Sequence, residues 1–276
     1  MKQFDGRVAA ITGAGSGIGR ALAIDLASRG AHLAVSDVDE VGLADTVSQC
    51  EGRGVKVTSQ LVDVADRAAV EAWADQVVAD HGRVNLIFNN AGVALTANVD
   101  TMSYEDLEWL MGINFWGVVH GTKAFLPHLK EAGEGHVVNL SSVFGLLSIP
   151  TQSAYNAAKF GVRGFTDALR IELDATDCGV SATTIHPGGI RTNIVRNARL
   201  DPTAGGLPED REAAAREFDR IARTTPEKAA RQILLAVQRN RRRALVGADA
   251  KVLDLVSRLP AGLYQRALAR GVQRRP

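Results

Sequence analysis

The residues of this chain that could do acid–base chemistry lie between positions 142 and 159. Tyr155 and Lys159 are four residues apart in a segment with a helical pattern, so both side chains lie on one face. Ser142 ends an apolar run thirteen residues before Tyr155. A phenol with its ordinary pKa of about 10 is a poor base at neutral pH, whereas a nearby ammonium group favours the phenolate. A Tyr–Lys pair at this spacing is also common in helices that have no catalytic role.

A second segment with a chemical signature is TGAGSGIG, residues 12–19, which follows the apolar run at 8–11. Glycines between a strand and a helix allow a tight turn and a close approach of the backbone to a ligand. The N-terminus of the following helix suits a pyrophosphate. The spacing differs from G-x-G-x-x-G and fits T-G-x-x-x-G-x-G. The alternative is a flexible turn in an α/β protein that binds no nucleotide.

An acidic residue supports the nucleotide interpretation. Asp37 ends the next apolar run, twenty residues after Gly17. A carboxylate at that distance can accept hydrogen bonds from the hydroxyls of the adenosine ribose, and it would repel a 2′-phosphate. Neither Ser16 nor Val38 offers a compensating cation. The sequence therefore favours NAD as the cofactor over NADP, unless Asp37 is only a surface residue at a strand end.

These residues need a framework, and the hydrophobic pattern predicts one. Short, nearly continuous apolar runs alternate with helical patterns, as expected for parallel strands buried on both faces. The predicted strands are residues 7–12, 31–36, 56–62, 83–89, 135–141, 180–186 and, more weakly, 244–247. We predict an α/β fold, a Rossmann-type doubly wound parallel seven-stranded sheet with helices on both faces in a single domain.

The domain prediction has three parts. Residues 1–250 form the dinucleotide-binding catalytic domain, and 188–225, a long irregular segment, is predicted to cover the substrate site. Residues 251–276 form a basic helical extension. Residues 239–276 carry nine Arg and one Lys against two Asp, a net charge of +8, although the whole chain is only +1.

The composition and the first residues of the chain bear on its cellular location and on metal binding. The 276 residues are 46% hydrophobic and begin MKQFDGRV, which lacks the apolar stretch of a signal peptide. No run of about 18 apolar residues is present to span a membrane, so we expect a cytoplasmic protein. Cys50 and Cys178 have no metal-ligand spacing around them, which predicts free thiols and no metal site.

Seven motifs occur in order along residues 5–250: TGAGSGIG at 12–19, Asp63 with Val64, NNAG at 89–92, Asn114, Ser142, YNAAK at 155–159 and PGGIRT at 187–192. In this combination the chain resembles the short-chain dehydrogenase/reductase family in its smaller form. The resemblance implies an NAD-dependent oxidoreductase that interconverts a secondary alcohol and a ketone, assembled as a homo-oligomer, a tetramer or a dimer.

The resemblance also implies roles for individual residues. Tyr155 would be the acid/base. Lys159 would lower the pKa of the Tyr155 phenol and hold the nicotinamide ribose. Ser142 would orient and polarise the substrate oxygen, and Asn114 would hold a water on the proton path to solvent. The cofactor-binding residues would be Gly13, Ser16, Gly17, Ile18, Gly19, Asp37, Asp63, Val64, Asn90, Gly92, Tyr155, Lys159, Pro187, Gly188, Ile190 and Thr192.

The substrate would lie outside the carboxyl ends of the strands. The candidate substrate residues there are mostly apolar: Val93, Leu95, Ser142, Phe144 and Ile149. They favour a hydrophobic alcohol or ketone, a small molecule. Arg191, Arg196 and Arg199 could instead meet an anionic group.

Two alternative functions stay open. An NADPH-dependent ketoreductase acting on acyl or lipid-like ketones would require the Asp37 argument to fail. A non-catalytic NAD-binding sensor would have no need for Ser142, Tyr155 and Lys159 together.

The C-terminal segment places Leu263, Tyr264, Ala267, Leu268 and Val272 on one side and Arg266, Arg270 and Arg274 on another. This pattern fits a helix packed on the domain or a neighbouring subunit, or a weak contact with a membrane surface. We predict no nucleic-acid partner.

Overall fold

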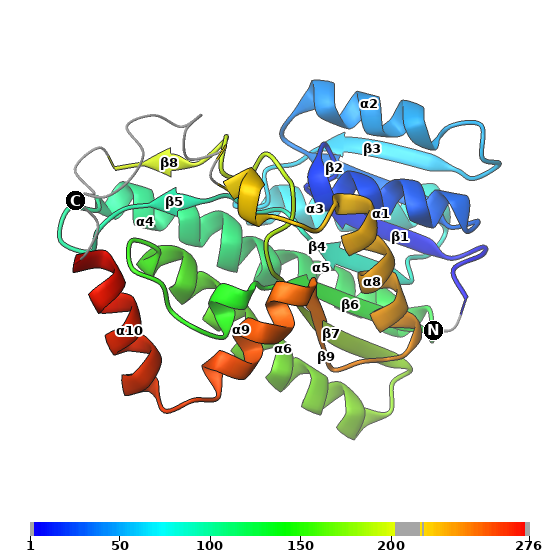
Figure 1. Ribbon diagram of the computed structural model, residues 1–276. Coiled ribbons are helices and arrows are strands. Elements are labelled where there is room, and N and C mark those ends of the chain that lie inside the picture. The colour runs from blue at the N-terminus through cyan, green and yellow to red at the C-terminus, as the bar shows by residue number, and fades with distance from the viewer. Residues whose placement is uncertain (1–2, 202–215, 217, 274–276) are drawn as a thin grey trace.

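A single parallel sheet organises the computed structural model, which describes residues 3–201, 216 and 218–273 (Figure 1). Within these residues the sheet has seven strands in the order β3-β2-β1-β4-β6-β7-β9. The strands are β1 (Val8–Thr12), β2 (His32–Asp37), β3 (Val57–Leu61), β4 (Leu86–Asn89), β6 (Gly135–Leu140), β7 (Val180–Pro187) and β9 (Arg243–Val246). Every residue of β1, β4 and β6 is buried, which explains their continuous apolar sequences. The predicted fold class is confirmed.

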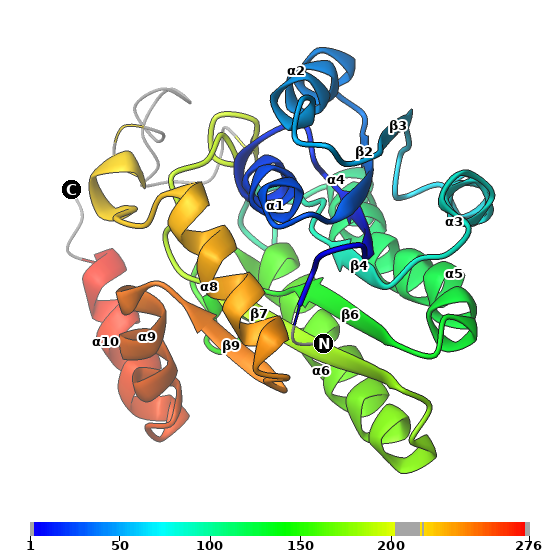
Figure 2. The same cartoon turned by 90° about the vertical axis from the view of Figure 1, so that its right-hand side faces the viewer.

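Helices cover both faces of the sheet (Figure 2). On one face lie α1 (Gly17–Ser28), α2 (Glu40–Cys50) and α8 (Pro226–Gln238). On the other lie α3 (Arg67–His81), α5 (Gly117–Glu131) and α6 (Ser153–Thr176). The second face is filled by large side chains such as Trp73 and Phe125, whose rings pack edge to face with centroids 5.0 Å apart. The two layers fix the strand ends from which the candidate site is built.

One predicted strand is shorter than its apolar run. We predicted residues 83–89, but β4 begins at Leu86. Just before β4, the backbone of Asn85 already bonds to Val8 and His136, both at 2.9 Å. Its side chain adds two more links, accepting the Val8 N–H and donating to the Glu134 carbonyl, both at 3.1 Å.

Several short elements carry no periodic sequence signal. Two-residue strands β5 (Leu95–Thr96) and β8 (Arg199–Leu200) pair in parallel. Helix α4 (Tyr104–Met111) continues into a π-helical turn, η1 (Gly112–Trp116), and η2 (Val143–Gly145) is a 3₁₀ turn. The predicted irregular segment 188–225 thus contains a strand, and its residues 202–215 and 217 lie outside the described part of the chain.

The C-terminal region forms α9 (Ala248–Ser257) and α10 (Ala261–Gln273). The boundary that we predicted after residue 250 falls inside α9. The side chain of Val272 and all of Arg274 lie outside what the structure describes. In the described residues we find no helix with the length and apolar character needed to cross a membrane. The cytoplasmic location stays a prediction.

Candidate active site

The end of β6 and the start of α6 bring three predicted catalytic residues together. Ser142 follows β6 and caps η2, where its hydroxyl accepts the Phe144 N–H at 3.1 Å. Tyr155 and Lys159 lie in the first two turns of α6. Lys159 Nζ donates to the Leu140 carbonyl at 3.0 Å and lies 5.5 Å from the centre of the Tyr155 ring. Phe144 packs edge to face on Tyr155, with ring centroids 6.0 Å apart.

Burial controls the protonation of this group. It raises the pKa of Tyr155 to about 12, and a hydrogen bond with Ser142 acts in the opposite direction. It lowers the pKa of Lys159 to about 8, because a buried ammonium loses its hydration. From the sequence we expected Lys159 to lower the pKa of Tyr155. Desolvation of the phenolate outweighs the hydrogen bond with Ser142, so Tyr155 is protonated at neutral pH, and the expected lowering by Lys159 and a bound nicotinamide stays a prediction.

Asn114 lies within the π-helical turn η1 and is fully buried. Its Oδ1 accepts the Val93 N–H and its Nδ2 donates to the Val93 carbonyl, both at 2.8 Å. A Cβ added at Gly92 would lie 3.2 Å from Asn114 Oδ1 and 3.6 Å from Lys159 Nζ. The NNAG segment, Asn114 and Lys159 therefore meet at one place, and the close approach favours glycine at position 92.

The glycine-rich turn after β1 is packed so tightly that it has no room for larger side chains. A Cβ at Gly19 would lie 2.1 Å from the Gly13 carbonyl oxygen, and Gly17 has a positive φ of 53°. Asn90 braces the turn by donating from Nδ2 to the carbonyls of Thr12 and Gly13 at 2.9 and 3.0 Å. Ser16 precedes α1, and its side chain makes no capping hydrogen bond. The turn leaves the start of α1 open to a ligand.

Asp37 stands beside this turn and is held by backbone groups. Its Oδ2 accepts the Gly15 N–H at 2.7 Å, and its Oδ1 accepts the N–H groups of Val38 and Asp39 at 2.7 and 3.0 Å. A carboxylate has about four lone-pair sites, so one on Oδ2 stays available to a ribose hydroxyl. The carboxylate position is thus fixed before any ligand arrives.

Two residues that sequence reasoning missed support the turn from behind. Arg20 donates to Thr46 Oγ1 at 3.0 Å, to the Gly42 carbonyl at 3.1 Å and to the Gly15 carbonyl. Thr46 Oγ1 donates to the Ala14 carbonyl at 2.8 Å. These contacts join α2 to the turn across more than twenty residues, a separation that no motif spacing could have indicated.

The PGGIRT segment faces the glycine turn from β7. A Cβ at Gly17 would lie 3.0 Å from the Thr192 methyl carbon, which places these two segments in contact. Asp249, another residue missed from sequence, accepts the Gly189 N–H at 2.6 Å, and a Cβ at Gly188 would lie 2.1 Å from its carboxylate. Ile190 is buried and bridges to Thr224, which fixes the segment that follows Pro187.

The other predicted cofactor residues lie around the same edge. Ile18 is half-buried in the first turn of α1. Asp63 is exposed after β3 and its Oδ1 accepts the Ala65 N–H at 2.9 Å, while Val64 is buried against Gly117. His186 is fully buried, with Nδ1 2.8 Å from the Ser142 carbonyl oxygen.

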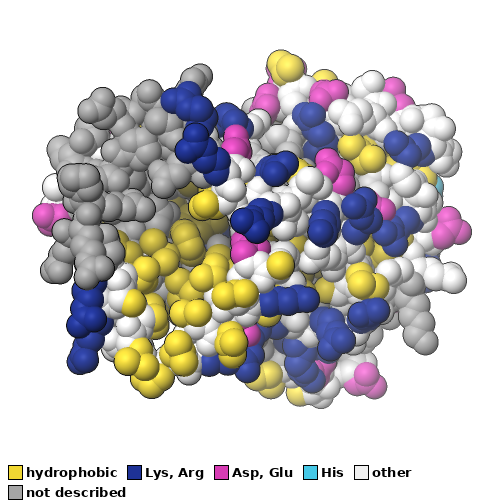
Figure 3. All heavy atoms as spheres, in the orientation of Figure 1, with side chains coloured by type: hydrophobic (Ala, Val, Ile, Leu, Met, Phe, Trp, Pro, Cys, Tyr) yellow, Lys and Arg dark blue, Asp and Glu magenta, His cyan; other side chains and the backbone are white. Residues whose placement is uncertain are grey.

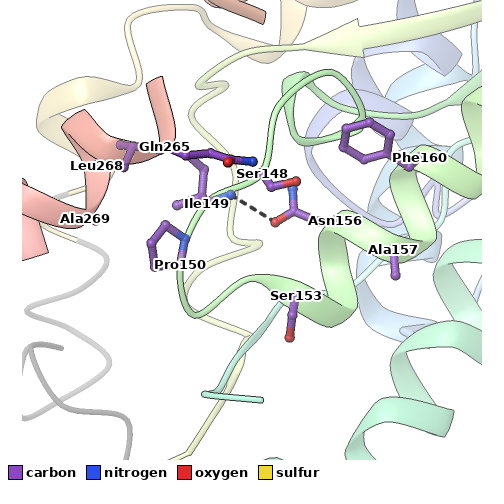
Figure 4. A pocket seen from close by; sticks show the side chains of 10 residues that line it. All are labelled: Ser148, Ile149, Pro150, Ser153, Asn156, Ala157, Phe160, Gln265, Leu268 and Ala269. Atoms are coloured by element: carbon purple, nitrogen blue, oxygen red, sulfur yellow. Dashed lines mark hydrogen bonds between the residues drawn. The ribbon is translucent and has the colours of Figure 1, made fainter. Parts of the chain in front are cut away.

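The predicted substrate residues have different surroundings. Val93 and Phe144 are half-buried beside the residues described above. Leu95 is buried in the cluster against which Tyr155 packs, so it supports the site from behind. Ile149 lines a cavity of about 530 Å³ between the 148–150 loop, α6 and α10 (Figure 4). There its N–H donates to Asn156 Oδ1 at 3.1 Å.

The three arginines that we considered for an anionic group, Arg191, Arg196 and Arg199, each have a protein partner. Arg199 stacks on the Trp109 ring at 3.9 Å and pairs with Asp106 at 2.8 Å. Arg196 pairs with Asp219 at 2.5 Å. Arg191 Nε donates to the Ala222 carbonyl at 2.9 Å. The Arg199 contacts hold the segment against α4, and the other two join parts of the segment to each other.

Residues 7–203 match a family model described as short chain dehydrogenase. The chain belongs to the short-chain dehydrogenase family. This short-chain dehydrogenase is 51% identical to SadH of Mycobacterium tuberculosis over 99% of its own length and 97% of that protein. Human estradiol 17-beta-dehydrogenase 11 is 35% identical over 73% of this chain and 68% of its own. The family resemblance and the enzyme class predicted from the motifs are confirmed.

Among solved structures, this short-chain dehydrogenase is similar to a short chain dehydrogenase/reductase from Burkholderia phymatum in complex with NAD. The TM-score is 0.85 and the identity 33%, with 97% of each chain covered. The glycine cradle, the uncapped start of α1 and the Thr192 contact fit a nicotinamide dinucleotide. The chain is thus an oxidoreductase of the CH–OH class that uses a nicotinamide cofactor.

Proposed function

We propose that the protein interconverts a hydrophobic secondary alcohol and its ketone with NAD, and that Tyr155 exchanges the proton. The observation that carries this proposal is the convergence of Ser142, Tyr155 and Lys159 at the carboxyl end of β6, beside the glycine cradle. When bound, the nicotinamide supplies or accepts the hydride. The residues of the chain bind and orient both molecules and move the proton.

The preference for NAD rests on the fixed carboxylate of Asp37. Three backbone N–H groups hold it at the end of β2, so it could not easily move away from a 2′-phosphate. Arg20, the basic residue of the neighbouring helix, is occupied by Thr46, Gly42 and an ion pair with Asp45 at 2.5 Å. A ribose with a free 2′-hydroxyl therefore suits this position better than a phosphorylated one.

The proton step follows from the protonation states. A Tyr155 hydroxyl with a pKa of about 12 can donate to a ketone oxygen at neutral pH. Ser142, which shares a hydrogen bond with Tyr155, would polarise and orient the same oxygen. Lys159 stays mostly charged at pH 7 and would stabilise the phenolate left after the transfer. In the reverse direction the phenolate accepts the alcohol proton.

Asn114 takes part as a positioning residue in this proposal. Both polar atoms of its side chain bond to Val93, which fixes the backbone at Gly92 and Val93 beside Lys159. The water that we expected at Asn114 stays a prediction.

The substrate class is proposed from the apolar walls. Phe144 covers Tyr155, Val93 adjoins Asn114, and the guanidinium groups of Arg196 and Arg199 are bound to aspartates. These features favour an uncharged, hydrophobic substrate over an anion. A relative named for estradiol, an apolar secondary alcohol, supports the same class. The expected homo-oligomer also stays a proposal.

The test is a calorimetric titration of the wild type and of Tyr155→Phe with NADH and NADPH, followed by turnover of hydrophobic secondary alcohols and ketones. We expect tighter NADH binding, turnover by the wild type, and retained NADH binding without turnover by the variant. Tighter NADPH binding would favour the ketoreductase. Undiminished turnover by Tyr155→Phe would refute the proposed acid/base, and wild-type binding without any turnover would favour a sensor.

A further inference from the structure

A stripe of exposed aliphatic side chains runs along α9 and onto α10. Its members are Val252, Leu255, Leu259 and Leu263, which are 62%, 68%, 49% and 58% exposed. Val252 and Leu255 lie three residues apart on one side of α9, Leu259 follows the end of that helix, and Leu263 lies near the start of α10. Figure 3 shows hydrophobic side chains gathered over α9 and toward α10. We call these four residues the C-terminal stripe.

Basic side chains border the C-terminal stripe on both helices. Lys251, Arg258, Arg266 and Arg270 are all exposed, and dark blue side chains lie next to the apolar area in Figure 3. Both aspartates of α9 are bound within the protein. Asp249 accepts the Gly189 N–H at 2.6 Å, and Asp254 is buried in ion pairs with Arg243 and Arg258 at 2.8 Å. The outward charge of the described part of α9 and α10 is therefore positive.

The C-terminal stripe is not the side of α10 that faces its own domain. Gln265, Leu268 and Ala269 line the cavity against α6 and the 148–150 loop (Figure 4). Leu263 and the exposed arginines lie on other sides of the same helix. One side of α10 thus faces its own domain across this cavity, while the C-terminal stripe lies in water, which costs free energy unless something covers it.

We propose that the C-terminal stripe and its basic rim bind the surface of an anionic lipid bilayer. Aliphatic side chains enter the boundary between headgroups and acyl chains, while Lys and Arg meet the anionic headgroups. A second copy of the chain fits this surface less well. A two-fold contact would place the same patch against itself, so that basic rim would meet basic rim. The surface is distinct from the cofactor residues, so the proposal does not depend on the reaction.

The experiment is co-sedimentation of the full chain with vesicles of phosphatidylcholine alone and of phosphatidylcholine mixed with phosphatidylglycerol. Leu255→Asp/Leu259→Asp tests the apolar part, and Arg266→Glu/Arg270→Glu tests the charge. The matched controls are Ile171→Asp, at an exposed apolar residue of α6, and Arg53→Glu/Arg67→Glu, at exposed basic residues near the opposite edge of the sheet. NADH binding checks that each variant folds, and light scattering gives its mass.

We expect the wild type and both controls to sediment with the anionic vesicles and much less with phosphatidylcholine alone. Both test variants should bind at least tenfold more weakly. In the arginine variant each lost cation costs about fivefold near an anionic surface. In the leucine variant two aspartates replace side chains that would enter the bilayer, and the anionic headgroups repel them. All chains should bind NADH and keep the same mass. Three results would overturn the proposal: no sedimentation of the wild type, test variants that bind like the controls, or a loss of mass in Leu255→Asp/Leu259→Asp without weaker vesicle binding. The last would show that a second copy covers the stripe.

Discussion

Replacing Lys159 by methionine should make the protein more stable while removing its turnover. Lys159 is only 4% exposed, and burial lowers its pKa from 10.5 to about 8. This shift means that the folded state carries a penalty of about 3 kcal/mol for keeping the ammonium charged at pH 7. Methionine has a similar length and no charge. It loses the hydrogen bond to the Leu140 carbonyl, which costs about 1 kcal/mol. The net gain should be about 2 kcal/mol.

The pH dependence gives this prediction a sign that can be checked. Between pH 8 and 10.5 the unfolded chain keeps the Lys159 proton while the folded protein releases it. Because the unfolded state then binds more protons, the stability of the wild type rises with pH across this window. The penalty is fully present below pH 8 and falls below about 1 kcal/mol by pH 10. The advantage of Lys159→Met should therefore shrink by about 2 kcal/mol between pH 7 and pH 10.

The assay is urea unfolding of the wild type and Lys159→Met at one protein concentration, at pH 7 and at pH 10, without added cofactor. Lys123→Met, at an exposed lysine of α5, is the control and should change the stability by less than about 0.5 kcal/mol. A Lys159→Met variant that is less stable than the wild type at pH 7 would refute the reasoning. A stability difference that is the same at both pH values would refute it too, because the lysine charge would then have no part in it.

Three further changes test the cofactor site and the 188–225 segment, which we predict to cover the substrate site. Gly19→Ala should weaken NADH binding at least tenfold by calorimetry, because its Cβ would lie 2.1 Å from the Gly13 carbonyl, whereas Gly164→Ala meets no atom within 4 Å and should bind normally. Asp37→Ala should shift the ratio of NADH to NADPH affinity at least tenfold toward NADPH, and an unchanged ratio would place selectivity elsewhere. Arg199→Ala, which loses the Trp109 and Asp106 contacts, should raise the KM for the alcohol several-fold with NADH affinity unchanged; equal effects on both would mean that the segment does not serve the substrate.

The sheet could be predicted from sequence because parallel strands buried on both faces leave long apolar runs. The residue spacings also located the glycine turn and the Tyr155–Lys159 pair. The pair β5–β8 could not be predicted, since two residues carry no periodicity, and its two strands lie about a hundred residues apart. The π-helical turn around Asn114 could not be predicted either, because the glycines that flank it, Gly112 and Gly117, do not distinguish a π-helical turn from an ordinary helix end.

Some residues that hold the cofactor loops lie far from them in the sequence, so motifs alone do not reveal them. Asp249 holds Gly189 from sixty residues away, and Thr46 holds Ala14 from thirty-two. Their sequence neighbourhoods resemble ordinary helix termini and faces. Only the packing of α2 against α1, and of α9 beside the end of β7, turns these side chains toward the cofactor loops.

The protonation of Tyr155 is the point at which spacing could not replace structure. The Tyr155–Lys159 spacing, together with the positive charge of a bound nicotinamide, favours a lowered phenol pKa, and that expectation stays a prediction. In the folded chain Lys159 is itself desolvated and bonded to the Leu140 carbonyl, while burial of Tyr155 opposes the phenolate. The balance of these effects leaves the phenol protonated. Residue spacing gives the attraction between the two charges but not the desolvation that opposes it, so the pKa of Tyr155 depends on burial as well as on Lys159.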